Sequence, residues 1–229
     1  MLAGVGPLLV AALVGGWWHQ IASALLLAPA LLGMAKADRT RAGIGMVLLA
    51  YVAHCATAIS LAYHLPAVAT GLLPDGAEYW AKQQVWIRTG EDPEYVLANW
   101  VPAHGQLYVV VVALSYLSLG LLPLVRGFYE VDLMNFYVGR MLAEGDGSIV
   151  SLLVGWHPWS VMRGICYAFV IFELASYSLE RMTGRVLSTA RRRKQRWALG
   201  AFFFLADCVV KIVTLDTVRG ALAVHLGEP

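Results

Sequence analysis

Five ionisable side chains stand in or beside the long apolar runs of this 229-residue sequence: His157, Arg163, Glu173, Asp207 and Lys211. A charge at membrane depth is costly, so such groups usually face a partner or a water-filled path and mark functional sites. Asp207 and Lys211 are four residues apart with the acid first, so a helix places both on one face. This spacing predicts an ion pair, with a proton or ion relay as the functional alternative.

Glu173 is the strongest single functional candidate, because it follows a run of apolar residues and stands about two helical turns before a basic cluster. Arg163 is too distant to pair with it, since ten helical residues span about 15 Å. We therefore expect Glu173 to face a neighbouring span or a subunit. We expect Arg163 and Ser160 instead to satisfy backbone groups at a nearby helix break.

That break is predicted by Gly155-Trp156-His157-Pro158-Trp159, inside the apolar block 148–179. The block is too short for two full spans of about 20 residues each. We expect a re-entrant or broken helix pair, with a half-helix over 148–156, a turn at His157-Pro158 and a longer returning helix. The alternative is one Pro-kinked helix, with segment 127–147 supplying the extra crossing. Broken backbone at membrane depth persists only where protein or water surrounds it.

Six histidines raise the question of a metal or haem site. The sequence contains no H-x-x-x-H, H-E-x-x-H or C-x-x-C-H motif, which are the short patterns typical of such sites. We therefore expect no metal site and no cofactor. The alternative is a site assembled from separate helices, for example by His54, His104 and His157.

The composition defines the elements that must position these groups. Hydrophobic residues make up 59% of the chain and charged residues 14%, against roughly 45–50% and 25% in soluble domains. This predicts an all-α fold, a polytopic transmembrane helical bundle that forms one integral membrane domain over 1–229. It excludes disordered, disulfide-framed and soluble nucleic-acid-binding classes. We expect about four full spans, near 7–34, 44–63, 106–125 and 197–215, plus the broken pair.

The distribution of charge predicts orientation. Basic residues gather at 36–41 and 181–196, whereas the segment 67–103 is acidic. By the positive-inside rule, the two basic segments are cytoplasmic and 67–103 is an extracytoplasmic loop of a protein in the inner (plasma) membrane. Within 67–103 we expect a helix near 77–89 and another between Pro93 and Pro102. Trp80, Trp86 and Trp100 should hold them at the membrane–water interface or against a partner; a lid is the alternative.

The C-terminal half contains Asn135-Phe136-Tyr137-Val138-Gly139, then Gly145, Gly155, His157-Pro158 and Phe172-Glu173-Leu174-Ala175. This order resembles the stage II sporulation protein M family. The chain departs from the family pattern where Pro158 replaces a glycine and where Glu173 follows His157 by sixteen residues rather than a few. The resemblance implies a non-enzymatic polytopic membrane protein, a scaffold or export-linked component of a larger assembly, and it carries over no catalytic residue.

These patterns favour a non-enzymatic membrane scaffold or transport-type subunit of a multi-protein inner-membrane complex. Its expected partners are the lipid bilayer and other membrane subunits, and not nucleic acid. One alternative is a proton- or ion-coupled secondary transporter that uses Arg163, Glu173, Asp207 and Lys211. A second is a membrane enzyme, or a haem or metal protein with histidine ligands.

Overall fold

The computed structural model of the protein describes residues 1–91, 96–145 and 148–227, which form helices and contain no strand. Four of the described helices, α3, α6, α9 and α10, are long and apolar enough to cross a membrane. The prediction of an all-α polytopic transmembrane helical bundle is therefore confirmed. The elements are α1 (Leu2–Val14), α2 (His19–Lys36), α3 (Thr40–His64), α4 (Pro66–Leu72), α5 (Gly76–Thr89), α6 (Leu97–Leu117), α7 (Leu121–Glu144), α8 (Ile149–Gly155), α9 (Pro158–Thr183) and α10 (Ala190–His225).

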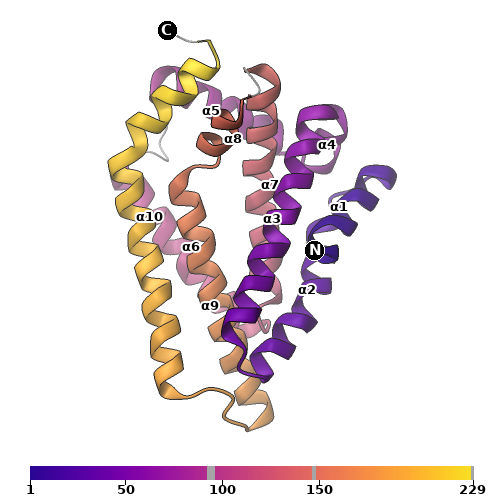
Figure 1. Ribbon diagram of the computed structural model, residues 1–229, viewed down its shortest axis with the longest axis vertical. Helices are drawn as coiled ribbons and strands as arrows, with labels where there is room; N and C mark the ends of the chain where they lie inside the picture. Colours follow the sequence, from indigo (N-terminus) through magenta and orange to yellow (C-terminus); the bar gives the residue numbers. More distant parts are fainter. Residues whose placement is uncertain (92–95, 146–147, 228–229) are drawn as a thin grey trace.

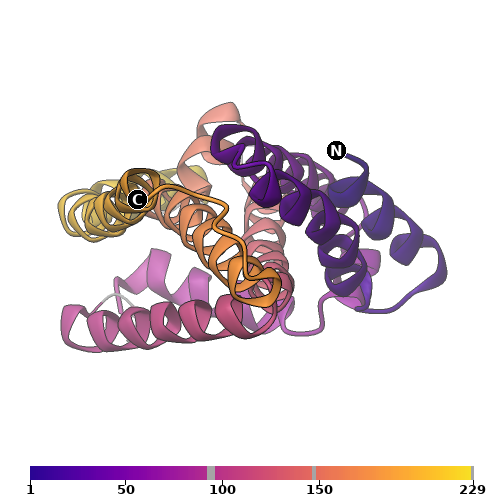
Figure 2. The ribbon, with the colours of Figure 1, turned by 90° about the horizontal axis from the view of Figure 1, so that it is seen from below.

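Helices α7 and α9 form the centre of the bundle. Helices α2, α3, α7, α9 and α10 run side by side along the longest axis, and α6 lies obliquely against α9 (Figures 1 and 2). Helix α7 packs on α2, α3, α5 and α6, while α9 packs on α2, α3, α6 and α10. Phe128 on α7 and Phe172 on α9 are among the largest completely buried side chains. The core therefore lies along these two helices.

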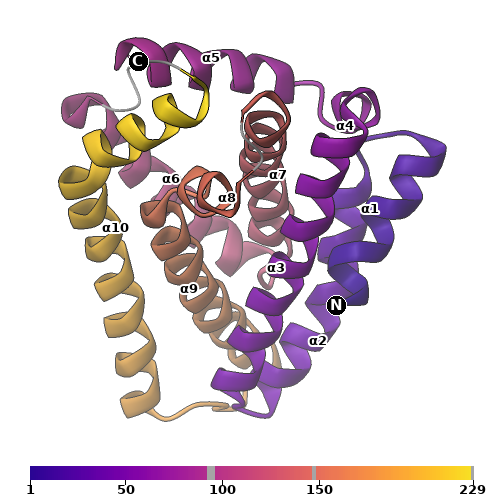
Figure 3. The same ribbon diagram turned by 45° about the horizontal axis from the view of Figure 1, so that its top comes forward.

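The two basic segments lie at the same end of the bundle. The α2–α3 turn contains Asp38, and its carboxylate accepts a hydrogen bond from Ser188 in the α9–α10 loop at 3.0 Å. Arg192 and Arg196 at the start of α10 pair with the same carboxylate. At the opposite end, α5 lies across the bundle (Figure 3). The chain thus separates its basic and acidic connections as the charge pattern predicted.

The predicted single span over 7–34 is wrong, because the chain breaks there into α1 and α2. Gly15 and Gly16 have φ angles of 83° and 104°, a left-handed region that glycine enters without a steric penalty. Trp18 Nε1 donates to the Gly15 carbonyl at 3.1 Å and holds the turn. Helix α1 then packs back on α2 and α3, and only α2 runs on to Lys36.

The segment 67–103 is also more structured than a surface loop. The helix expected near 77–89 is present as α5. Trp80, Trp86 and Trp100 are only 6%, 1% and 2% exposed, so these rings pack inside the chain and do not lie freely in water; their depth relative to the membrane interface stays a prediction. Two of them, on α5, join a core cluster with α7 residues, because the apolar face of α5 covers the end of the bundle. Helix α6 already begins at Leu97 and continues through Pro102; Pro93 lies outside the described residues.

The predicted break at His157-Pro158 is confirmed, since α8 ends at Gly155 and α9 begins at Pro158. The segment 127–147, which precedes α8, is not the short connection that the preferred interpretation assumed. Residues 127–144 belong to α7, a 24-residue helix rather than a short connection. Helix α8 packs on α7 and α10, toward the end of the bundle opposite the α2–α3 turn (Figure 1). The chain therefore returns through α7 and α9, so the extra passage comes from the polar segment, as in the alternative.

Candidate functional site

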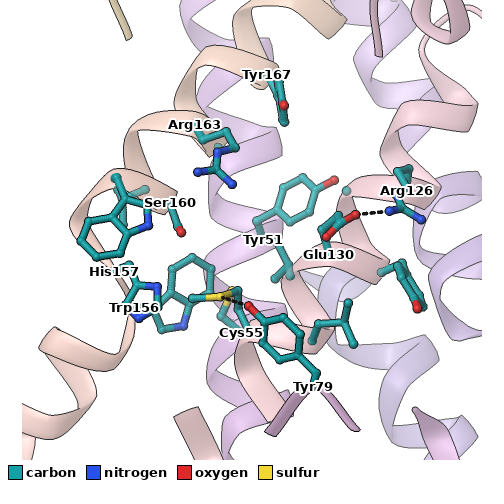
Figure 4. A pocket seen from close by; sticks show the side chains of 18 of the residues that line it. Tyr51, Cys55, Tyr79, Arg126, Glu130, Trp156, His157, Ser160, Arg163 and Tyr167 are labelled. Atoms are coloured by element: carbon teal, nitrogen blue, oxygen red, sulfur yellow. Dashed lines mark hydrogen bonds and ion pairs between the residues drawn. The ribbon is translucent and has the colours of Figure 1, made fainter. Parts of the chain in front are cut away.

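A large cavity opens between α3 and α7 on one side and α6 and α9 on the other (Figure 4). Its volume is about 1460 Å³, and most of its wall is apolar or aromatic. Three of the five predicted site residues, His157, Arg163 and Lys211, line it. The polar side chains of the wall include Tyr51, His104, Arg126, Glu130, Ser160, Arg163, Tyr167 and Lys211.

Arg163 and Asp207 form an ion pair between α9 and α10 at the wall of this cavity. The guanidinium donates from Nε and Nη2 to the two carboxylate oxygens, at 3.0 and 3.1 Å. Asp207 is completely buried, whereas the Arg163 side chain keeps 21% of its surface exposed. This side-on geometry leaves Nη1 outside the pair. A paired guanidinium with one free edge can bind an anion from the cavity.

The predicted pairing of Asp207 with Lys211 is therefore wrong, although both residues lie on α10. A guanidinium matches a carboxylate with two parallel hydrogen bonds, which an ammonium cannot do. Lys211 Nζ instead lies 4.7 Å from the centre of the Trp100 ring, in a cation–π contact. The α9–α10 packing decided the partner, and helical spacing alone could not reveal it.

Arg163 does not satisfy the helix break, contrary to our expectation. The backbone does so locally, because the amide of His157 donates to Gly155 at 3.0 Å and that of Ser160 to His157 at 2.8 Å. Pro158 has no amide hydrogen to satisfy. The His157 ring is buried and stacks on Trp159 with 4.6 Å between ring centres. The break therefore has an aromatic setting and needs no charged partner.

Glu173 lies away from the cavity, at the end of the bundle that carries the basic segments. It faces α10, as expected, and its carboxylate pairs with Arg196 and, at 3.5 Å, with Arg193. Arg196 also donates to Thr40 at 2.8 Å and to Ser188 at 2.9 Å. Glu173 thus belongs to a network that joins α3, α9, α10 and the loop before α10.

Asp38 completes that network from the α2–α3 turn. Burial by itself would raise the pKa of its carboxyl group, but hydrogen bonds from Ser188 and Arg192 and the Arg192 charge outweigh it. The pKa of Asp38 is therefore held below its ordinary value of 3.8. The carboxylate stays ionised and ties the two basic segments together.

The structure does not bring His54, His104 and His157 to one site. His104 and His157 line the large cavity, whereas His54 faces α2 and α7, where it meets His19 and Asp132. Asp132 accepts from Gln20 as well, at 2.9 Å. Sequence reasoning missed His19, Gln20 and Asp132, because they come from segments that looked like a polar interruption and a connecting loop.

No protein-family model, curated protein or solved structure matches this chain. Function is therefore inferred from the geometry alone. The described residues place two polar groupings in the interior of the bundle: the charged wall of the cavity and the His19–His54–Asp132 cluster. The resemblance to the stage II sporulation protein M family remains a prediction from residues 135–175.

Proposed function

We propose that this chain is a non-enzymatic, transport-type membrane protein whose cavity binds an amphipathic molecule with an anionic group. The observation that carries the proposal is the guanidinium of Arg163 in a wall that is mostly apolar and aromatic. Ligand sites commonly combine such walls with a few polar groups that fix orientation. Arg163 would take that orienting role.

The size of the cavity favours a lipid-like ligand. Sites for drug-sized molecules occupy roughly 300–1,000 Å³, and this cavity holds about 1460 Å³. Leu107, Val111 and Ile171 supply aliphatic surface for a hydrocarbon chain, while Trp156 supplies an aromatic face. A molecule with an acyl chain and a charged head group would use both parts of the wall.

The position of Arg163 favours an anionic group. Its guanidinium lines the cavity and keeps part of its surface exposed there, while two of its nitrogens hold Asp207. The neighbouring pair of Arg126 and Glu130 is neutral (Figure 4). An anionic head group that reached the exposed edge of the Arg163 guanidinium would accept charge-assisted hydrogen bonds from it. If transport is coupled to a proton or ion, these cavity charges would take part and Glu173 would not.

The proposed setting is the inner (plasma) membrane, beside other membrane subunits, with 36–41 and 181–196 cytoplasmic and 67–103 outside. Support comes from the meeting of both basic segments at one end of the bundle. The family resemblance agrees with a non-enzymatic component of a larger assembly. A scaffold-type subunit would differ in one respect, because a partner's helix would fill the cavity.

Binding of fluorescent lipids to the protein in phosphatidylcholine nanodiscs tests the proposal. The probes are phosphatidic acid and phosphatidylcholine that carry the same label on one acyl chain. The variant Arg163→Gln/Asp207→Asn removes the guanidinium without burying an unpaired charge. We expect it to bind the anionic probe at least about tenfold more weakly, a loss of about 1.4 kcal/mol, and the zwitterionic probe as before.

The matched control is Arg185→Gln, which removes an exposed arginine of the α9–α10 loop. It should bind both probes like the unchanged protein. Equal binding of the anionic probe by the double variant would contradict the proposal. The proposal is also contradicted if neither probe binds and a partner protein co-purifies in a fixed stoichiometry. That outcome favours the scaffold.

A further inference from the structure

The cluster of His19, His54 and Asp132 brings three metal-ligating side chains together from three helices. His19 Nε2 lies 2.9 Å from Asp132 Oδ2, and His54 Nε2 lies 2.6 Å from Asp132 Oδ1. All three side chains are buried, and their ligand atoms lie within 4.8 Å of one another. We propose that these residues form a binding site for a divalent transition-metal ion such as Zn²⁺ or Fe²⁺.

The hydrogen bonding of His54 requires a proton or a metal ion between this ring and Asp132. His54 Nδ1 lies 2.8 Å from the Gly4 carbonyl oxygen, which can only accept, so Nδ1 must carry a hydrogen. In a neutral imidazole, Nε2 then has a lone pair, and it points at a carboxylate oxygen of Asp132. Two acceptors so close repel each other. Either a proton or a metal ion must lie between the two side chains.

The surroundings favour a metal ion over a proton. Ligating histidines commonly donate their second ring N–H to a backbone carbonyl, and ligating carboxylates are themselves hydrogen-bonded. The Gly4 carbonyl supplies the first of these contacts to His54, and Gln20 supplies the second to Asp132 at 2.9 Å. Phe128 packs against the His54 ring with 4.9 Å between centres. His54 and Asp132 therefore have the polar supports and the apolar surroundings of metal ligands, whereas Nδ1 of His19 has no hydrogen-bond partner among the described residues.

Space for a further ligand lies next to the cluster. A small cavity of about 20 Å³ borders His19 and Asp132, and one water molecule needs at least about 10–15 Å³. Two histidines, one carboxylate and a remaining position suit Zn²⁺ and Fe²⁺. Tetrahedral bonds of about 2.0–2.1 Å would separate the ligand atoms to about 3.3 Å. The two N–O distances of 2.9 and 2.6 Å would therefore lengthen by less than an ångström when an ion binds.

Metal analysis of the full chain tests the proposal. The protein is purified in detergent with a tag that lacks histidine, stripped with a chelator, reloaded with Zn²⁺ and desalted. Elemental analysis should then find one ion per chain. Loading with Co²⁺ should produce ligand-field absorption in the visible range, which reports bound nitrogen and oxygen ligands.

Two variants locate the site. His19→Gln and Asp132→Asn keep hydrogen-bonding side chains in place, and each should weaken Co²⁺ binding at least about tenfold. The matched control is His64→Gln, because His64 is an exposed histidine on α3, the helix of His54. It should bind Co²⁺ like the unchanged protein.

The proposal is overturned if the unchanged protein retains substoichiometric Zn²⁺ and gives no Co²⁺ absorption, since a shared proton then explains the cluster. Equal Co²⁺ affinity in Asp132→Asn would overturn it as well. If a variant does not fold, the measurements on the unchanged protein decide alone. Lipid binding in the large cavity uses different residues, so either proposal can fail without the other.

Discussion

Arg163 and Glu173 each form an ion pair with a residue of α10. Removal of Arg163 leaves Asp207 without its partner, whereas removal of Glu173 affects Arg196. Asp207 is completely buried, and among the described residues both of its side-chain hydrogen bonds come from Arg163. Arg196, the partner of Glu173, keeps further bonds to Ser188 and other neighbours. A buried charge that loses its partner costs far more than a pair replaced as a whole. The two sites should therefore respond very differently to substitution.

We expect Arg163→Ala to lower the free energy of unfolding by about 3–5 kcal/mol, which a strong fall of the thermal midpoint in detergent would report. Glu173→Gln should lower it less, because the amide still accepts from Arg196. Most of the loss in Arg163→Ala should be absent from Arg163→Gln/Asp207→Asn, which removes both charges together. Arg185→Ala serves as the control and should match the unchanged protein. An equal loss in Arg163→Ala and Glu173→Gln would contradict this assignment.

Asp38 gives the stability a predictable dependence on pH. Because its folded pKa lies below its unfolded value, the stabilisation is complete above the unfolded pKa and is lost as pH falls through the folded pKa. The thermal midpoint should be level between about pH 5 and 7 and fall below about pH 4. The thermal midpoint of Asp38→Asn should be lower than that of the unchanged protein at neutral pH and should fall less on acidification. Glu78→Gln, at an exposed position on α5, should follow the unchanged protein.

The sequence revealed some of these side chains and concealed others for a physical reason. Arg163, Asp207 and Lys211 were recognisable because each interrupts or adjoins a strongly apolar run. Their partners depend on which helices pack together, so the Arg163–Asp207 pair could not be foreseen. Asp132 stood among Arg126, Glu130 and other charges, where a buried carboxylate looks like part of a loop.

Helix α7 shows the same difficulty in an element. Hydropathy predicted α3 and α10 as full spans and α9 as the returning helix of the broken pair, while the span predicted over 106–125 runs past the end of α6 at Leu117 into α7. The helices α3, α6, α9 and α10 are apolar enough for lipid. Helix α7 carries charged residues and still lies at the centre, because α2, α3, α5 and α6 surround it. Several of its charges pair with each other one turn apart along the helix, as Arg126 with Glu130 and Arg140 with Glu144, and Asp132 pairs with His19 and His54 on neighbouring helices. Hydropathy detects helices whose surfaces are apolar all round. It misses a helix such as α7, whose polar residues are covered by other helices.

The close packing of α7 on α3 depends on Gly139. A Cβ atom at this position would stand 2.5 Å from Ala62 Cβ and 2.9 Å from the Ile59 carbonyl oxygen, so α3 or α7 would have to move. Overpacking of this kind costs about 1–3 kcal/mol. We expect Gly139→Ala to lower the thermal midpoint accordingly. Gly164→Ala on α9 is the matched control, because a Cβ there meets nothing within 4 Å; an equal loss in both would argue against the α3–α7 contact.

The arrangement of the whole bundle follows from its two unlike ends. At one end Asp38 joins the α2–α3 turn to the α9–α10 loop, and most of the basic residues of the chain gather around it. At the other end α5 covers the bundle, and its basic residues are Lys82 and Arg88. Loops rich in lysine and arginine are retained in the cytoplasm, so the end with few basic residues is predicted to be the translocated one. The bundle therefore has one predicted orientation.

Cysteine labelling in intact cells tests this orientation. The background variant replaces Cys55, Cys166 and Cys208 by alanine. Single cysteines are then introduced at Glu91, beyond α5, and at Val186, in the α9–α10 loop, both of which are exposed. A membrane-impermeant maleimide should label position 91 in intact cells and position 186 only after permeabilisation, because the basic end faces the cytoplasm. Labelling of both positions in intact cells would refute the topology. Reversed labelling would keep the bundle but invert its orientation, so that the basic end would face outward.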